Sequence, residues 1–426
     1  MTTTGSPPVA ASLKKKISGQ FAWALAGRII AALMQALLLI LVARHATVSQ
    51  FGILGATLGA ATLMQTAFDM GIQPYVTRER VLRGDSGSIA KAFRFNLITS
   101  FFLLVVSTAI LAILAFLVNV DFVYLLPLGV WVSLERTADL RLSVSFADGD
   151  VRGNAVNLSS RRVGATALFA VLIWLHTEPL FAYSLSVATA AFGSLIFVTY
   201  YTRGRVTARP DISFTELFRA CWPFWLNSVS AQARNLDTTI AAACAGSVQA
   251  GLFAVASRVT NPLRLLPSTF ASILLPHAAR ASGSRRDAIT LLKLSSAILG
   301  ATTALYCVVA AVIPWFVPFA LGDSYTSAVW PVLIVIFGLP FAAAVSLFSS
   351  MLQGYGFKHF VATISTISVV ICLPMVGLGA YLSGAVGASI ALTVSFVLQA
   401  AANLLGIYYL VLGRRAASPR MIETDD

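Results

Sequence analysis

A long series of apolar stretches constrains this chain more than any other feature. A transmembrane helix needs about 20 mostly apolar residues. The sequence predicts twelve such stretches, over residues 21–43, 51–76, 95–118, 121–147, 154–175, 179–201, 221–245, 250–278, 291–313, 329–352, 360–382 and 384–412. Charged residues are only 11% of the 426 residues, whereas a soluble domain has about 25%. We therefore expect an all-α integral membrane protein with about twelve transmembrane helices.

The basic residues lie mainly at one end of these stretches. Of the 30 lysines and arginines, 21 fall on one side if the stretches cross the membrane in turn, and only Arg44 falls in a loop on the other side. The positive-inside rule makes the crowded side cytoplasmic and predicts that both termini lie there. Because the basic residues are dispersed over seven short segments, the net charge of +13 is a topology signal, and nucleic acid is not an expected partner.

The stretches divide into two halves that resemble each other. The fragment "QFGILGATLGA" (50–60) is similar to "QAGLFAVASRV" (249–259), about 200 residues later. Each half has an even number of spans, which predicts parallel repeats with a site between them. The expected domains are a cytoplasmic segment (1–20), a six-helix bundle (21–201), a cytoplasmic linker (202–220), a second six-helix bundle (221–412) and a cytoplasmic tail (413–426).

Charged residues inside the spans indicate a polar interior. An arginine at the bilayer centre costs about 2.5–3.5 kcal/mol on insertion scales, so it must face water, pair with an acid or reach the membrane edge. The spans contain eight arginines, Arg28, Arg136, Arg141, Arg161, Arg162, Arg234, Arg258 and Arg264, and four acids, Asp69, Glu135, Asp139 and Asp237.

Three of the arginines are predicted to line a site. Arg28 has no acid near it in sequence and shares a helix face with Gln35, seven positions later. Arg258 and Arg264 lie in a segment that two prolines interrupt. Breaks of this kind at membrane depth are found beside cavities.

The other charges allow structural roles. Arg234 and Asp237 are three apart and can touch, either as a self-neutralising pair or as part of a site in which Asp237 couples transport to an ion. Glu135 and Asp139 favour a salt-bridged gate. Arg161 and Arg162 are expected to reach the membrane edge with their long side chains, and Asp69 is expected to be structural, near the basic end of its helix.

Several fragments together resemble a known family. They are "LVARHATVSQFGILG", "DMGIQPYVTRE", "NLDTTIAAACAGSVQAGLFAVASRV", "ILLPHAAR", "FALGDSYTSAVWPVLIVIFGLPFAAAVSLFSSMLQGYGFKHF" and "SGAVGASIALTVSFVL". Their order and spacing resemble the Wzx-type polysaccharide flippases of the multidrug/oligosaccharidyl-lipid/polysaccharide exporter superfamily. The resemblance implies a V-shaped pair of six-helix bundles in the bacterial cytoplasmic (inner) membrane. It also implies that alternating access moves oligosaccharides carried on a polyprenyl diphosphate, for O-antigen or exopolysaccharide synthesis.

The resemblance also implies a substrate site. Related lipid II flippases keep arginines on helices one and eight, at positions matching Arg28 and Arg258, but they have two further helices, which argues against lipid II as the substrate here. Guanidinium groups bind diphosphate oxygens bidentately, so the diphosphate is expected to contact Arg28, Arg234, Arg258 and Arg264. Sugar hydroxyls are expected to contact Gln35, Gln65, Asn227, Gln232 and Asn235. The ion-coupling or gating candidates are Asp69, Glu135, Asp139 and Asp237.

Two rival functions have less support in the sequence. A cation-drug exporter of the same superfamily would need an acidic cavity, but arginines outnumber acids in the spans. A membrane-embedded glycan polymerase or ligase would need a large external loop, and the longest expected one covers only residues 314–328. Scattered cysteines and histidines indicate neither metal site nor cofactor nor enzymatic centre. We expect a monomer whose partners are the lipid-linked oligosaccharide, membrane lipid, and a polysaccharide polymerase with other export machinery.

Overall fold

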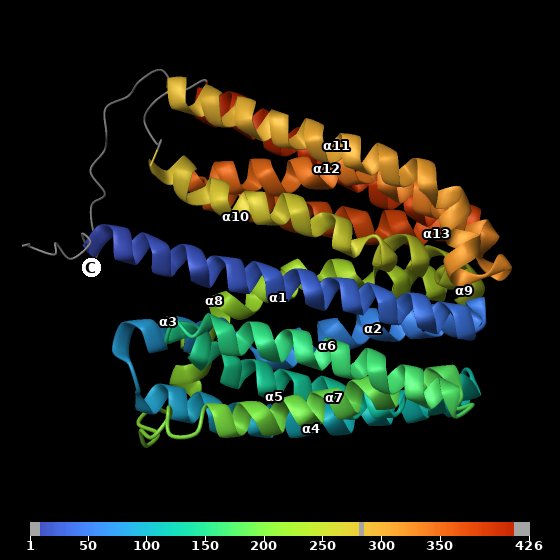
Figure 1. Cartoon of the computed structure of the whole chain (residues 1–426), viewed down its shortest axis with the longest axis horizontal. Helices are drawn as coiled ribbons and strands as arrows, with labels where there is room; N and C mark the ends of the chain where they lie inside the picture. The colour runs from blue at the N-terminus through green and yellow to red at the C-terminus, as the bar shows by residue number, and fades with distance from the viewer. Residues whose placement is uncertain (1–8, 281–284, 413–426) are drawn as a thin grey trace, which may run out of the picture. The chain divides into compact units, whose positions relative to one another are not determined.

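Helices form all the regular structure in the described residues, 9–280 and 285–412 of this computed structural model (Figure 1). The prediction of an all-α fold is thereby confirmed. The α-helices are α1 (Val9–His45), α2 (Val48–Asp69), α3 (Ile72–Arg83), α4 (Gly87–Leu117), α5 (Pro127–Ala147), α6 (Val151–Trp174), α7 (Pro179–Tyr201), α8 (Phe214–Gln232), α9 (Asp237–Ala254), α10 (Leu265–Arg280), α11 (Arg285–Leu321), α12 (Val329–Gly354) and α13 (Lys358–Gly406).

Short helical turns join some of these elements. The 3₁₀ turns are η1 (Val120–Leu125), η2 (Ala233–Leu236), η4 (Asn261–Arg264) and η5 (Asp323–Ala328), and the π-helical turns are η3 (Val255–Val259) and η6 (Ile407–Leu412). By their internal contacts the residues form two compact units, which we call unit 1 (1–46 and 57–232) and unit 2 (47–56 and 233–426). The start of α2 therefore packs with unit 2, and the rest of α2 packs with unit 1.

Two predicted boundaries were wrong. A single helix was expected over residues 51–76, but α2 ends at Asp69 because Met70 and Gly71 have left-handed backbones, with φ of 49° and 75°. Gly71 also packs so closely on the α8 backbone that a Cβ there would lie 2.5 Å from the Cys221 carbonyl oxygen. Residues 314–328 were expected to be a loop, but α11 continues through this segment to Leu321.

Two of the helices contain a turn. At 49 residues α13 would be about 74 Å long, more than twice the hydrocarbon thickness of about 30 Å. Its backbone turns at Ser383 and Gly384, where φ of Gly384 is 59°. The backbone of α9 turns in the same way at Gly246, with φ of 81°. Gly246 lies between the predicted stretches 221–245 and 250–278, and the turn at Ser383 and Gly384 lies where stretch 360–382 was expected to end and 384–412 to begin.

The repeated fragments meet inside unit 2. Gly52 of α2 and Gly251 of α9 hold equivalent places in the two fragments, and each packs directly on the other helix. A Cβ on Gly52 would overlap the Ser247 carbonyl oxygen, and one on Gly251 would overlap the Val48 carbonyl oxygen. Only glycine allows backbones to approach this closely, as at many helix crossings in membranes.

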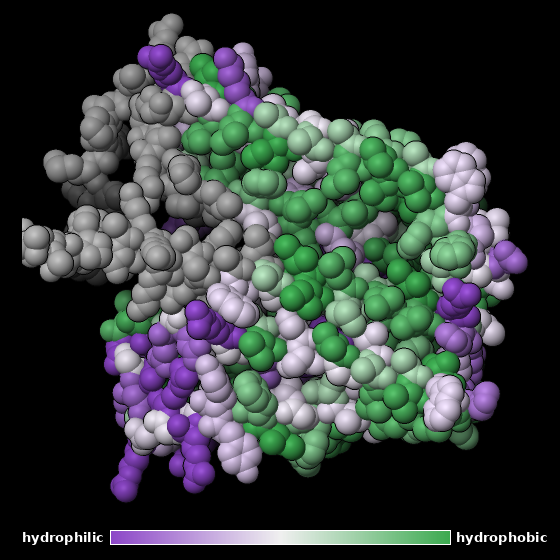
Figure 2. Space-filling view, in the orientation of Figure 1, coloured by the Kyte–Doolittle hydropathy of each residue, from purple (hydrophilic) through white to green (hydrophobic). Residues whose placement is uncertain are grey.

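The surface of the helices suits a lipid environment. Eight segments of the described chain are long and apolar enough to cross a membrane, and large apolar side chains such as Phe116 and Phe319 are 88% and 80% exposed. On the face that Figure 2 shows, apolar side chains cover the middle of the helices, and hydrophilic ones gather toward their ends. The protein is therefore a multi-pass membrane protein.

Candidate functional site

The buried arginines of unit 1 are neutralised by carboxylates. Arg161 of α6 places Nη1 3.0 Å from Asp139 Oδ1 and 3.4 Å from Glu135 Oε1, both on α5. Arg162 Nη2 lies 3.0 Å from the same Glu135 oxygen. The expectation that Arg161 and Arg162 reach the membrane edge was wrong, because two acids on the facing helix compensate their charges inside the bundle.

A second pair joins α2 to α5. Arg136 Nε lies 3.8 Å from Asp69 Oδ1, and the Arg136 guanidinium also donates to Thr99 Oγ1 at 2.7 Å and Ser100 Oγ at 3.3 Å. Buried ion pairs of this kind hold helices together without adding much net stability. Three acidic coupling or gating candidates, Asp69, Glu135 and Asp139, thus lie in ion pairs within unit 1.

The other candidates of unit 1 lie apart from these pairs. Arg28 is exposed on α1, and Gln35 is half-buried on the same helix. The Gln35 Oε1 atom is buried and has no hydrogen-bond partner among the described residues. Gln65 Nε2 donates to the Val132 carbonyl oxygen at 3.1 Å, so this amide links α2 to α5.

Unit 2 holds an arginine cluster of a different kind. Arg234 in η2 and Arg264 in η4 lie over the ring of Phe396 in α13, with their guanidinium carbons 5.1 and 4.9 Å from its centroid. Arg234 Nη2 donates to Gln399 Oε1 at 3.0 Å and, more weakly, to Ser368 Oγ at 3.5 Å. The buried Arg264 Nε has no hydrogen-bond partner in the described residues. We call Arg234, Arg264, Phe396 and Gln399 the arginine cluster.

Helix breaks place these arginines. The α-helical hydrogen bonding stops at η2, η3 and η4, where irregular backbone at membrane depth needs polar or cavity surroundings. Arg258 in η3 donates from Nη2 to the Gly55 carbonyl oxygen at 3.0 Å and to the Asn235 carbonyl oxygen at 3.5 Å. The predicted proline-interrupted segment is therefore present, and Arg258 satisfies backbone carbonyls in it.

Asp237 interacts electrostatically with Arg234 and Arg264 but forms no direct ion pair with either in the described residues. Its Oδ1 accepts from the backbone N–H of Thr238 at 2.5 Å and from the Thr238 hydroxyl at 3.0 Å. In the described residues no carboxylate oxygen lies within 4.0 Å of the Arg234 or Arg264 guanidinium. The direct contact between Arg234 and Asp237 that the sequence allowed is absent from the described residues, because the carboxylate binds the start of its own helix, although its charge still acts on Arg234.

The remaining sugar-contact candidates lie close to the cluster in sequence. Gln232 and Asn235 are half-buried at the end of α8 and in η2, and the Asn227 side chain lies outside the described residues. Sequence reasoning missed Phe396, Ser368 and Gln399. Ser368 and Gln399 are polar residues in strongly apolar stretches, which is a signal that could have found them. Phe396 is one of many aromatic residues in the spans, and no pattern distinguishes it.

The cluster can bind an anion. Two guanidinium groups lie over one aromatic ring, and α13 offers an amide and a hydroxyl as further hydrogen-bonding groups. Planar guanidinium groups stack on aromatic rings and bind phosphate or carboxylate oxygens bidentately. One nearby carboxylate, Asp237, compensates the two arginines only in part. The remaining positive charge is costly in a site of low dielectric, and a bound polyanion would remove that cost.

The fold and the apolar surface define a multi-pass membrane exporter, and the comparisons with known proteins agree. Residues 19–282 match the family described as polysaccharide biosynthesis protein, and the chain belongs to that family. No curated protein sequence matches it significantly. Family and fold point to a transporter rather than to a catalytic enzyme.

Solved structures share the fold at low sequence identity. A multidrug resistance MATE family transporter of the MOP superfamily, in an inward-facing conformation, is 14% identical with a TM-score of 0.73, over 92% of this chain and 100% of that chain. A MOP superfamily transporter from Pyrococcus furiosus is 13% identical with a TM-score of 0.63, over 94% and 97% of the two chains. A MATE transporter from Vibrio cholerae is 15% identical with a TM-score of 0.61, over 95% and 98%.

Proposed function

We propose that this protein moves a polyprenyl-diphosphate-linked oligosaccharide across the bacterial cytoplasmic membrane by alternating access, for O-antigen or exopolysaccharide synthesis. The observation that carries the proposal is the arginine cluster, in which Arg234 and Arg264 share the Phe396 ring with no carboxylate within 4.0 Å in the described residues. Membership of the polysaccharide biosynthesis family supports a glycan pathway. On this proposal both termini are cytoplasmic, and a monomer acts with a polymerase and other export machinery.

In this proposal the cluster holds the diphosphate. The two guanidinium groups supply paired N–H donors, and Gln399 and Ser368 keep Arg234 in place from α13. Arg258 in η3 holds the broken backbone of unit 2 and lies six residues before Arg264 in η4, so we keep it as a diphosphate contact. Arg28, exposed on α1 in unit 1, is kept as a further proposed diphosphate contact.

The amides are proposed to bind the sugars. Gln35 offers a buried oxygen without a hydrogen-bond partner in the described residues, which a sugar hydroxyl would satisfy. Gln65, Asn227, Gln232 and Asn235 are kept as further sugar contacts. Gln65 can contact a sugar hydroxyl through its amide oxygen while Nε2 keeps its hydrogen bond to the Val132 carbonyl oxygen.

Asp237 is the coupling group that we propose. The other candidate acids, Asp69, Glu135 and Asp139, lie in ion pairs. Asp237 is 8% exposed, and in the described residues it accepts hydrogen bonds from Thr238 and forms no ion pair within 4.0 Å. We expect Asp237→Asn to abolish the proton or sodium dependence of transport in proteoliposomes while leaving substrate binding within about twofold of wild type. Unchanged ion dependence would rule out this role for Asp237.

Export of small cationic molecules is the second candidate. The likeness to a multidrug resistance MATE family transporter favours it, but a likeness of 14% identity bears on the fold alone. The Pyrococcus furiosus structure is described by a reverse polarity of its binding pocket that suggests a different function. One fold can thus hold pockets of either charge, and the arginine cluster favours an anion.

Binding measurements separate these two functions. A soluble short-chain polyprenyl diphosphate should bind the detergent-solubilised protein, and Arg234→Gln with Arg264→Gln should weaken binding at least about tenfold, because each charge-assisted bond contributes about 1.5–3 kcal/mol. Arg286→Gln, an exposed arginine at the start of α11, is the matched control and should bind normally. Tight binding of a cationic dye with no binding of the diphosphate would favour the exporter of cations instead.

A further inference from the structure

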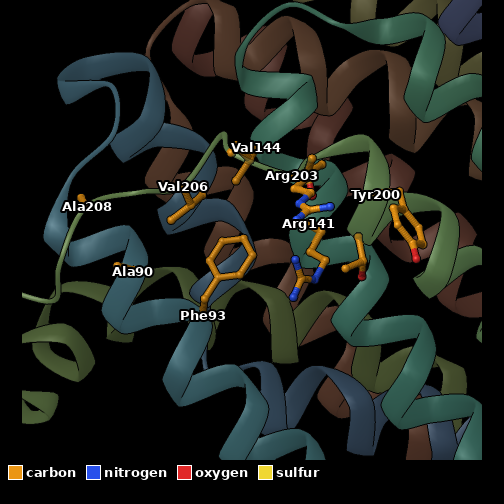
Figure 3. Close-up of a pocket in the computed structure, with 11 residues that line it drawn as sticks. Ala90, Phe93, Arg141, Val144, Tyr200, Arg203, Val206 and Ala208 are labelled. Atoms are coloured by element: carbon orange, nitrogen blue, oxygen red, sulfur yellow. The ribbon is translucent and has the colours of Figure 1, made fainter.

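A cavity of about 560 Å³ lies at the basic end of unit 1, apart from the arginine cluster. Its walls come from the start of α4, the last turns of α5 and α7, and residues 202–208 after α7. Figure 3 shows Arg141 and Arg203, from different segments, next to each other in the view, with Phe93 on one side and Tyr200 on the other. This volume is in the range of small-molecule sites.

In the described residues the two arginines of this cavity have no carboxylate partner, unlike two neighbouring arginines. Arg80 and Arg205, at the same end of unit 1, lie 2.8 and 2.9 Å from carboxylate oxygens of Asp148 and Asp150. For Arg141 and Arg203 no carboxylate oxygen lies within 4.0 Å in the part of the chain that the structure describes. Thus Asp148 and Asp150 compensate arginines beside the cavity, and the net charge of the side chains that line the cavity is positive.

Arg141 is held in place without a hydrogen bond to its Nε. That atom is buried and has no hydrogen-bond partner among the described residues, and the guanidinium carbon lies 5.6 Å from the Phe93 ring centroid. A buried donor without an acceptor costs about 1–3 kcal/mol. An anion in the cavity would accept from this group and remove that cost.

An apolar stripe leads away from the cavity along α4. Phe93 lines the cavity, and Leu97 and Phe101 follow at intervals of four residues, so they share one helix face. Leu97 and Phe101 are each 63% exposed. A ligand that fits both features has an anionic head and an apolar chain.

We propose that this cavity binds the phosphodiester headgroup of an anionic membrane phospholipid, with an acyl chain along Phe93, Leu97 and Phe101. Basic pockets between transmembrane helices are known places for such headgroups. The phosphate accepts from Arg141 and Arg203, and Thr202 or Tyr200 lies near enough in the cavity wall to contact the glycerol. The inference does not depend on the proposed transport function, since it concerns other residues and another ligand.

The test uses the full-length protein in detergent, with short-chain phosphatidylglycerol as the probe. Native mass spectrometry and thermal unfolding should both show saturable binding of phosphatidylglycerol. Phosphatidylcholine, whose headgroup has no net charge, and inorganic phosphate, which lacks the apolar chain, should each bind about tenfold more weakly or not at all. Equal stabilisation by inorganic phosphate would overturn the assignment to a lipid.

Variants separate the cavity from surface charge in general. Arg141→Gln with Arg203→Gln should weaken phosphatidylglycerol binding about tenfold or more, whereas Arg94→Gln, an exposed arginine of α4 outside the cavity, should bind as wild type does. Ala90→Trp fills the cavity without changing charge and should also weaken binding. The proposal fails if the double variant, or Ala90→Trp, binds the lipid as tightly as Arg94→Gln does.

Discussion

Replacing Glu135 with glutamine should destabilise unit 1 strongly. The Glu135 side chain is 6% exposed and lies 3.4 Å from Arg161 Nη1 and 3.0 Å from Arg162 Nη2. Glu135→Gln keeps the shape but removes the charge that both arginines face. Removing one partner of a buried pair costs about 3–5 kcal/mol. We expect about 3 kcal/mol, because Arg161 keeps Asp139 at 3.0 Å and Arg162 is 19% exposed.

Asp69→Asn is the matched control for this loss of charge. Asp69 lies 3.8 Å from Arg136 Nε, and Arg136 keeps its hydrogen bonds to Thr99 and Ser100. The contact of Asp69 with one arginine at 3.8 Å is weaker than the two shorter contacts of Glu135, so the loss of Asp69 should lower the free energy of unfolding by less than the loss of Glu135 does. Unfolding in mixed detergent micelles, followed by tryptophan fluorescence, measures both free energies.

A compensating variant checks the cause. Glu135→Gln combined with Arg162→Gln should recover part of the lost stability, because the uncompensated buried charge is removed along with its partner. The reasoning is refuted if Glu135→Gln lowers the free energy of unfolding no more than Asp69→Asn does, or if the double variant is no more stable than Glu135→Gln.

Two further predictions concern packing and pH. Gly251→Val should cost at least about 1–3 kcal/mol and lower the amount of folded protein, because its Cβ would overlap the α2 backbone. Gly300→Val, whose Cβ would meet nothing within 4 Å, should be mild in the same expression and unfolding assays. Partial burial alone would raise the pKa of Asp150, but hydrogen bonds from Tyr201 and Arg205 outweigh it and lower the pKa below the ordinary 3.8. This carboxylate therefore stabilises the fold above about pH 4 and loses that effect as the pH falls through its folded pKa. Below about pH 4 the melting temperature of the wild type should fall more steeply than that of Asp150→Asn, and parallel curves would contradict the assignment.

The sequence was sufficient to predict the helical membrane fold. Apolar length is a direct consequence of bilayer thickness, so the spans could be read one at a time without tertiary information. Where a boundary depended on another helix, prediction failed. The end of α2 at Asp69 follows from the packing of Gly71 on α8, and the sequence of residues 51–76 contains no sign of that contact.

The candidate site could be predicted only in part. The sequence shows which arginines lie in apolar stretches, and these could be chosen as candidate site residues. Two of them, Arg234 and Arg264, do form one cluster in unit 2. Their shared partner Phe396 lies more than 130 residues away in sequence, so only the tertiary fold brings them together. The same holds for Arg161 and Arg162, whose acids Glu135 and Asp139 lie on a neighbouring helix.

Transport of a lipid-linked saccharide in proteoliposomes tests the central claim most directly. The substrate is a polyprenyl diphosphate that carries a fluorescent sugar, and a membrane-impermeant quencher reports how much of it has changed leaflet. We predict transfer by the wild type and by Arg286→Gln, and a loss of at least about tenfold for Arg234→Gln with Arg264→Gln at equal protein amount. Transfer by the double variant at the wild-type rate, or no transfer by any of the three proteins, would contradict the account.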